Sequence, residues 1–191
     1  DACRQLNAWQ AAGLNFPGRI AVNVSAKQLQ DPTISNRLQS IVSNAGLTPD
    51  KFELELTEST MMADPMGAIA IMDDLSKAGF SLAIDDFGTG YSSLSYLKRF
   101  SVDRIKIDIS FVRDMLKNKD DYAIVKAIIA MADSLGLQTT AEGVEQAEQA
   151  VALNELGCNF VQGYHFGKPQ STELFAETWL HQTPETCDTA D

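Results

Sequence analysis

Short strand-like runs alternate with longer helical patterns along almost the whole 191-residue sequence. The expected strands span residues 20–24, 52–56, 81–85, 104–108, 138–141 and 160–162. The expected helices span residues 1–10, 32–45, 65–78, 92–98, 122–135, 146–156 and 172–180. A strand–helix unit that recurs about every 25–30 residues predicts a parallel sheet, either doubly wound or closed into a barrel.

The two faces of the expected strands differ in polarity, which separates these two folds. Successive side chains point to opposite faces of a strand, so Glu53 and Glu55 share one face of the second strand and apolar residues share the other. In the fourth strand, Lys106 lies opposite Ile105 and Ile107. A doubly wound sheet is apolar on both faces, whereas a barrel gives each strand a lumen and a helical shell. We therefore expect an α/β fold of the TIM-type (β/α) barrel class.

Polar side chains collect at the carboxyl ends of the expected strands, where barrel enzymes build their active sites. These residues are Asn23, Glu55, Asp85, Asp86, Lys106, Glu142 and Gln162. Oxygen donors with no nearby His or Cys favour Mg²⁺ or Mn²⁺ over zinc. The adjacent Asp85 and Asp86 predict a two-metal site for phosphoryl chemistry. Lys106 is expected to hold developing negative charge or to orient a water, and Glu142 to be a further ligand or a general base.

Each residue taken alone also has a simpler interpretation. Glu53 and Glu58 are typical of solvated charges at a strand end, and Lys106 of a salt-bridge partner for a nearby aspartate. The loop that holds Gly88 and Gly90 resembles a truncated nucleotide-binding fingerprint, but it lacks the third glycine. We interpret it instead as a mobile active-site loop hinged on glycines. The prediction of a site depends on the common location of these residues.

The balance of charge excludes several kinds of partner. The chain has 15 Lys and Arg against 26 Asp and Glu, for a net charge of -11. This excess of acid argues against binding to DNA or RNA and against docking on an anionic membrane. The three cysteines and two histidines form no zinc-module spacing, and the scattered cysteines fit a reducing, cytoplasmic location. A phosphate-ester substrate would need metal ions to supply positive charge.

Six segments together resemble the EAL domain, the bacterial cyclic di-GMP phosphodiesterase family, which has a modified TIM-barrel fold. They are residues 23–25 (NVS), 53–59 (ELELTES), 85–93 (DDFGTGYSS), 106–108 (KID), 142–145 (EGVE) and 162–164 (QGY). Their order and spacing match the family pattern from residue 1 to about residue 180. The resemblance implies hydrolysis of cyclic di-GMP to linear pGpG with two Mg²⁺ or Mn²⁺ ions.

The resemblance also implies a role for each matching residue. The expected metal ligands are Asn23, Glu55, Asp85, Asp86 and Glu142, and Glu55, Asp85, Lys106 and Glu142 form the expected catalytic set. Lys106 is expected to contact the reacting water, and Glu142 to be a second-metal ligand or general base. Glu58 is expected to anchor the loop of Gly88 and Gly90, which is linked to dimerisation in the family. The expected substrate contacts are Asp108, Glu145 and Gln162.

The signature Glu-Ala-Leu tripeptide and its adjoining arginine do not occur in the sequence. The family has eight strands and six are expected here, so we expect the first two to lie outside this chain. The EAL-type domain is then expected over residues 1–182, with a frayed tail at 183–191 and with sensory or GGDEF-type domains upstream. Two other hypotheses are an inactive EAL-like module that senses cyclic di-GMP or a protein partner, and an unrelated two-metal barrel phosphatase. The intact motifs disfavour both.

Overall fold

The computed structural model describes residues 1–90 and 94–180, which contain one parallel sheet of six strands in the order β1 to β6. The strands are β1 (Ile20–Asn23), β2 (Phe52–Thr57), β3 (Ser81–Phe87), β4 (Arg104–Ile107), β5 (Gln138–Ala141) and β6 (Phe160–Val161). Each strand begins at its predicted residue and ends within two residues of its predicted end. The predicted tail and residues 91–93 of the predicted loop lie outside the described residues.

The predicted helices are present, with small changes at their ends. They are α1 (Ala2–Ala11), α3 (Ile34–Asn44), α5 (Pro65–Lys77), α6 (Leu94–Leu97), α8 (Lys119–Ser134), α9 (Ala147–Glu155) and α10 (Thr172–Phe175), which continues into the π-helical segment η2 (Ala176–Leu180). The described residues also include a short 3₁₀ turn, η1 (Pro49–Lys51).

Three short helices directly follow strands and were not predicted. They are α2 (Ala26–Leu29), α4 (Glu58–Ala63) and α7 (Ile109–Asp114). Each begins at a residue whose side chain accepts a hydrogen bond from a backbone N–H of the first turn, namely Ser25, Thr57 and Asp108. Such caps satisfy donors that a helix start leaves free. The chain therefore turns sharply where β1, β2 and β4 end, and this turn fixes the side chains at that rim.

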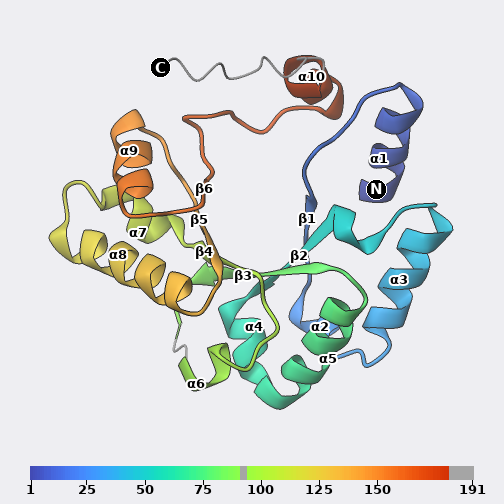
Figure 1. The fold of residues 1–191 in the computed structure, drawn as a ribbon, viewed down its shortest axis with the longest axis horizontal. Helices are drawn as coiled ribbons and strands as arrows, with labels where there is room; N and C mark the ends of the chain where they lie inside the picture. The colour runs from blue at the N-terminus through green and yellow to red at the C-terminus, as the bar shows by residue number, and fades with distance from the viewer. Residues whose placement is uncertain (91–93, 181–191) are drawn as a thin grey trace.

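The sheet is curled, with its helices on the outside, which confirms the expected α/β fold (Figure 1). Apolar side chains of the strands face these helices and are almost fully buried, among them Leu54, Leu82 and Ile105. In the described part of the chain β1 and β6 each pair with a single neighbour, so the six strands form an arc that is open between these two edges.

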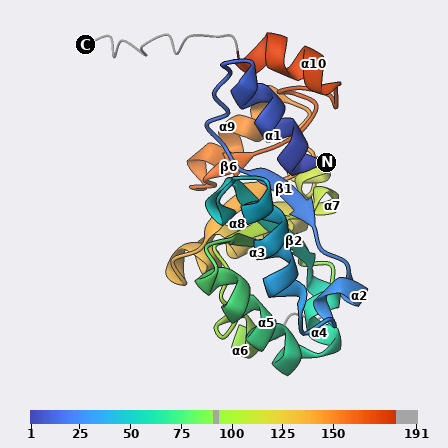
Figure 2. The same ribbon diagram turned by 90° about the vertical axis from the view of Figure 1, so that its right-hand side faces the viewer.

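A cavity of about 900 Å³ lies at this opening and is mainly aromatic and apolar. At one side of it α10 lies beside α1, as Figure 2 shows. The Trp9 ring lies 5.6 Å from the ring centroids of both Phe16 and Phe175. None of the predicted metal ligands lines this cavity. The candidate site therefore lies elsewhere, at the carboxyl ends of the central strands.

The interpretation of Glu53 and Glu58 as solvated charges is wrong, because both side chains are buried. Glu53 lies on the concave face of β2 and forms an ion pair with Arg104 of β4 at 3.2 Å. The Arg104 guanidinium also lies 4.2 Å from the centroid of the Phe160 ring. Sequence patterns place a charge on a face of a strand, but they do not show that a partner on another strand allows its burial.

Candidate active site

Lys106 is the centre of a buried cluster of charges at the carboxyl end of the sheet. Its Nζ atom lies 2.8 Å from Oε1 of Glu55, 3.0 Å from Oδ1 of Asp85 and 2.8 Å from Oε1 of Glu142. The three carboxylates come from β2, β3 and the end of β5, and the Lys106 side chain is only 7% exposed. Lys106 is thus a salt-bridge partner of Asp85, as its simpler interpretation requires, and it also joins residues of four strands.

The carboxylates keep Lys106 in its charged form. Burial alone would lower the pKa of the ammonium. Hydrogen bonds to Glu142, Glu55 and Asp85 outweigh that effect and raise the pKa of Lys106 well above its usual value. The side chain is therefore a hydrogen-bond donor and a fixed positive charge at neutral pH, and it cannot accept a proton.

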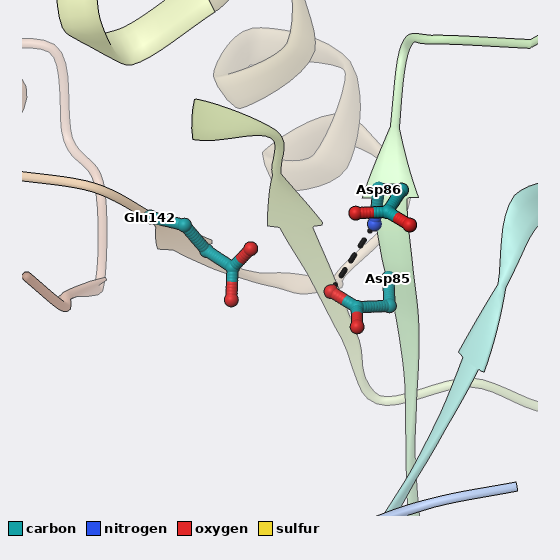
Figure 3. Close-up of side chains that lie close together, drawn as sticks. All are labelled: Asp85, Asp86 and Glu142. Carbon is teal, nitrogen blue, oxygen red and sulfur yellow. Dashed lines mark hydrogen bonds between the residues drawn. The ribbon is translucent and has the colours of Figure 1, made fainter. Parts of the chain in front are cut away.

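Asp85 and Asp86 are neighbours in sequence, and a local irregularity of β3 lets both take part in the cluster. The pairing of β3 with β4 shifts register between Ile84 and Phe87, and Asp86 has a φ of 55°. A left-handed conformation is uncommon for a non-glycine residue, although Asp tolerates it better than most. The Asp86 N–H donates to Oδ1 of Asp85 at 3.1 Å (Figure 3). The irregularity breaks the alternation that would send the two side chains to opposite faces.

Asp85, Asp86 and Glu142 form a group that could hold a metal ion. Their nearest carboxylate oxygens all lie within 4.8 Å of one another, and Figure 3 shows Glu142 directed toward the two aspartates from the neighbouring part of the sheet. Burial, reinforced by the charges of Asp85 and Asp108, raises the pKa of Asp86. Burial also raises the pKa of Glu142, although Lys106 opposes this effect.

Negative charge exceeds positive charge at the cluster, because the Lys106 ammonium contacts three carboxylates and a fourth, Asp86, lies beside them. An oxygen-rich donor set with excess negative charge fits hard divalent cations. The donor set of this structure therefore agrees with the metal chemistry expected from the sequence.

Glu58 contacts the glycine-rich segment that follows β3. Its Oε2 atom accepts a hydrogen bond from the Gly88 N–H at 3.0 Å. A Cβ atom added at Gly90 would lie 2.7 Å from Oε1 of Glu58, so the two residues are closely packed. Within residues 1–90 and 94–180, Oε1 is buried without a hydrogen-bond partner. Glu58 thus lies where a residue that anchors this loop would have to be.

The remaining predicted residues surround the cluster without joining it. Asn23 is exposed on β1, at the position that pairs with Glu55 of β2. Asp108 caps α7, where its Oδ1 accepts from the Ser110 N–H at 2.9 Å, and its charge acts on Asp86. Glu145 and Gln162 are exposed at the same rim.

The structure also identifies polar residues near the site that the sequence patterns did not single out. Thr140 pairs with Lys106 across β4 and β5, and its buried hydroxyl has no partner among the described residues. Gln149 of α9 is 2% exposed and its side chain connects α7 to the segment that precedes α9. Thr140 lies two residues before Glu142, and this spacing was the available sign that it shares the concave face. Gln149 gave no such sign.

Comparison with known proteins agrees with the fold. The EAL domain family matches residues 1–169, and the chain belongs to this family. Cyclic di-GMP phosphodiesterase PdeR of Escherichia coli is 41% identical over 179 residues, which cover 94% of this chain and 27% of that protein. The chain spans about a quarter of the length of the curated relatives it matches.

Solved structures show the same relationship. The PaMucR phosphodiesterase in complex with c-di-GMP matches with a TM-score of 0.86 and 41% identity, over 91% of this chain and 70% of that one. A manganese and cyclic di-GMP complex of Klebsiella pneumoniae BlrP1 matches with a TM-score of 0.78 and 33% identity, over 88% of this chain and 42% of that one.

Among the helices at residues 1–90 and 94–180, none is both long and apolar enough to cross a membrane.

Proposed function

We propose that this domain hydrolyses cyclic di-GMP to linear pGpG. The observation that carries the proposal is the contact of Lys106 with Glu55, Asp85 and Glu142 at 2.8–3.0 Å, with Asp86 beside them. Relatives whose names specify a cyclic di-GMP phosphodiesterase, such as PdeR and NbdA, support the substrate and the reaction.

The cluster is proposed to bind two divalent cations, Mg²⁺ or Mn²⁺. Asp85, Asp86 and Glu142 are proposed to supply oxygen donors, because their carboxylates lie within 4.8 Å of one another. Glu55 of the cluster and Asn23, at the paired position of β1, are proposed as further donors. The manganese complex of BlrP1 supports the choice of metal. When bound, the cations would neutralise phosphate oxygens and lower the pKa of the attacking water.

Lys106 and Glu142 are proposed to have different roles in the reaction. The water oxygen forms a bond to phosphorus, the bond from phosphorus to one ribose oxygen breaks, and the proton that the water loses ends on that ribose oxygen as a hydroxyl group. Because its pKa is raised, Lys106 stays protonated; it can orient the water or stabilise negative charge on the phosphoryl oxygens. Glu142 lies 2.8 Å from this ammonium and is a candidate acceptor for the proton.

The substrate is proposed to lie across the rim, against Asp108, Glu145 and Gln162. Asp108 is half-buried and the other two side chains are exposed, so groups of a dinucleotide could reach all three. We also propose that the domain forms a dimer through the glycine-rich loop that Glu58 anchors. The proposal further includes additional domains elsewhere in a longer protein and a cytoplasmic location. The greater length of the relatives supports the further domains.

The test is turnover of cyclic di-GMP by the intact protein with Mg²⁺, with Mn²⁺ and with EDTA, followed by chromatography of the product. We expect linear pGpG with either metal and none with EDTA. Asp85→Asn removes a carboxylate from the centre of the cluster and should reduce turnover at least about 100-fold. If cyclic di-GMP binds but is not hydrolysed under any metal condition, the domain is a binding module and the proposal is wrong.

A further inference from the structure

Gln149 makes four hydrogen bonds through its side-chain amide, and all four go to backbone groups. Its Oε1 atom accepts from the N–H groups of Glu145 at 2.9 Å and Gln146 at 3.0 Å. Its Nε2 atom donates to the carbonyl groups of Val112 at 2.9 Å and Arg113 at 3.1 Å. Because Gln149 is 2% exposed, these bonds form away from water, where an unpaired backbone group is costly.

The two segments that Gln149 joins follow the two strands that carry Lys106 and Glu142. Val112 and Arg113 belong to α7, which begins after Asp108 at the end of β4. Glu145 and Gln146 lie between Glu142, at the end of β5, and the start of α9. Gln149 therefore connects the far ends of two short segments whose near ends are in the candidate site.

A second contact holds the near ends of the same segments together. Gly143 has a φ of 71°, and a Cβ atom added there would lie 2.1 Å from Cγ1 of Ile109, the first residue of α7. On the opposite side, the Val144 N–H donates to the Gln162 carbonyl at 3.0 Å, and the His165 N–H donates to the Val144 carbonyl at 3.0 Å. The segment after Glu142 is thus fixed from both neighbouring strands.

We propose that Gln149 is a positioning residue that sets Glu142 and Glu145 relative to Lys106 and Asp108. It acts only through the backbone of its neighbours. The proposal builds on the proposed function, since it assigns Gln149 to the same site. Catalytic groups must be held within about 0.5 Å of their productive geometry, and a displacement of about 1 Å can cost a factor of 100 in rate.

The first test is Gln149→Met in the intact protein, which keeps the length of the side chain and removes all four hydrogen bonds. We expect kcat for cyclic di-GMP to fall at least about 10-fold, and the Kd for Mn²⁺ measured by calorimetry to rise about 10-fold or more. Both are measured well below the unfolding temperature and are corrected for the folded fraction by circular dichroism. Gln10→Met, at an exposed position of α1, is the matched control and should change neither value.

A purely structural role would lower the unfolding temperature and leave kcat per folded molecule and the Kd for Mn²⁺ unchanged, and that result would overturn the proposal. Gln149→Glu keeps the two accepting bonds but sets a buried carboxylate oxygen against the carbonyls of Val112 and Arg113, so it should give a loss at least as large in the same direction. Should both variants fail to fold, Ile109→Ala loosens the contact with Gly143 at a residue that is 45% exposed. It should also lower kcat and weaken Mn²⁺ binding, and wild-type values would contradict the proposal.

The two proposals fail in different ways. If the wild-type protein binds Mn²⁺ but does not hydrolyse cyclic di-GMP, the proposed function is wrong. The effect of Gln149→Met on the Kd for Mn²⁺ then still decides whether Gln149 positions the carboxylates.

Discussion

Replacement of Lys106 by methionine should strongly destabilise the metal-free protein. The change keeps most of the volume of the side chain and removes the positive charge that contacts Glu55, Asp85 and Glu142. These carboxylates are 10%, 15% and 19% exposed, so water can compensate little for the lost ammonium. Removing one partner of a buried ion pair costs about 3–5 kcal/mol because the other charge is left buried and unpaired.

The size of the loss should depend on pH in a defined direction. A lysine with a raised folded pKa contributes its stabilisation in full below its ordinary value of 10.5, so the wild-type contribution is complete at neutral pH. In Lys106→Met the Glu142 carboxylate loses the cation that opposes the effect of burial, so the folded pKa of Glu142 should rise further. Protonation then favours the folded variant, and its deficit should shrink as the pH falls from about 8 to 5.

Urea unfolding of the metal-free protein in EDTA measures this effect. At about pH 8 we expect Lys106→Met to lose about 3–5 kcal/mol, whereas Lys126→Met, at an exposed position of α8, should stay within about 0.5 kcal/mol of the wild type. Saturating Mn²⁺ should recover part of the loss, since bound cations stabilise the folded state. A loss below about 1 kcal/mol at pH 8, or a deficit that grows as the pH falls, would refute the electrostatic reasoning.

Two further predictions concern the Arg104–Glu53 ion pair and the carboxylates of the candidate site. Arg104→Met leaves the buried Glu53 without its ion-pair partner and should lower the free energy of unfolding by about 3–5 kcal/mol. The double variant Arg104→Met/Glu53→Gln should recover a large part of this loss. Equal losses in the single and double variants would exclude the coupling of the two charges. Metal binding requires ionised carboxylates, and burial raises the pKa values of Glu142 and Asp86. As the pH is lowered, the affinity for Mn²⁺ measured by calorimetry should therefore begin to fall at a higher pH than for a site of ordinary carboxylates. An affinity that does not change between about pH 8 and 5 would contradict this prediction.

The sheet could be predicted from the sequence because its signals are local. Alternation of apolar and polar residues defines each strand, and the first residue of every strand was predicted. The helices α2, α4 and α7 have only four to six residues, which is too short to show a helical period. Their capping residues Ser25, Thr57 and Asp108 were visible in the sequence, but such residues also occur in many turns.

The candidate site was predictable as a list of residues, but its geometry was not. Strand alternation places Asp85 and Asp86 on opposite faces, and only the register shift with a φ of 55° at Asp86 brings both into the cluster. The burial of Glu53 depends on Arg104, which is 51 residues away in sequence. Gln149 acts through backbone groups, and no sequence pattern records those. In each case the missing information is a contact between elements distant along the chain.

Charge balance on the concave face of the sheet explains why the site lies at one end of it. Deeper in the sheet, the charge of Glu53 is matched by Arg104, and Gln138 and Ser81 add hydrogen bonds, although Nε of Arg104 has no partner among the described residues. That layer is paired and can remain buried without any ligand. At the carboxyl ends, Lys106 alone faces several carboxylates, and the pKa values of Glu142 and Asp86 are raised as a result of burial and this crowding. Uncompensated negative charge favours the binding of protons or cations, so this rim suits a cation better than the paired layer beneath it.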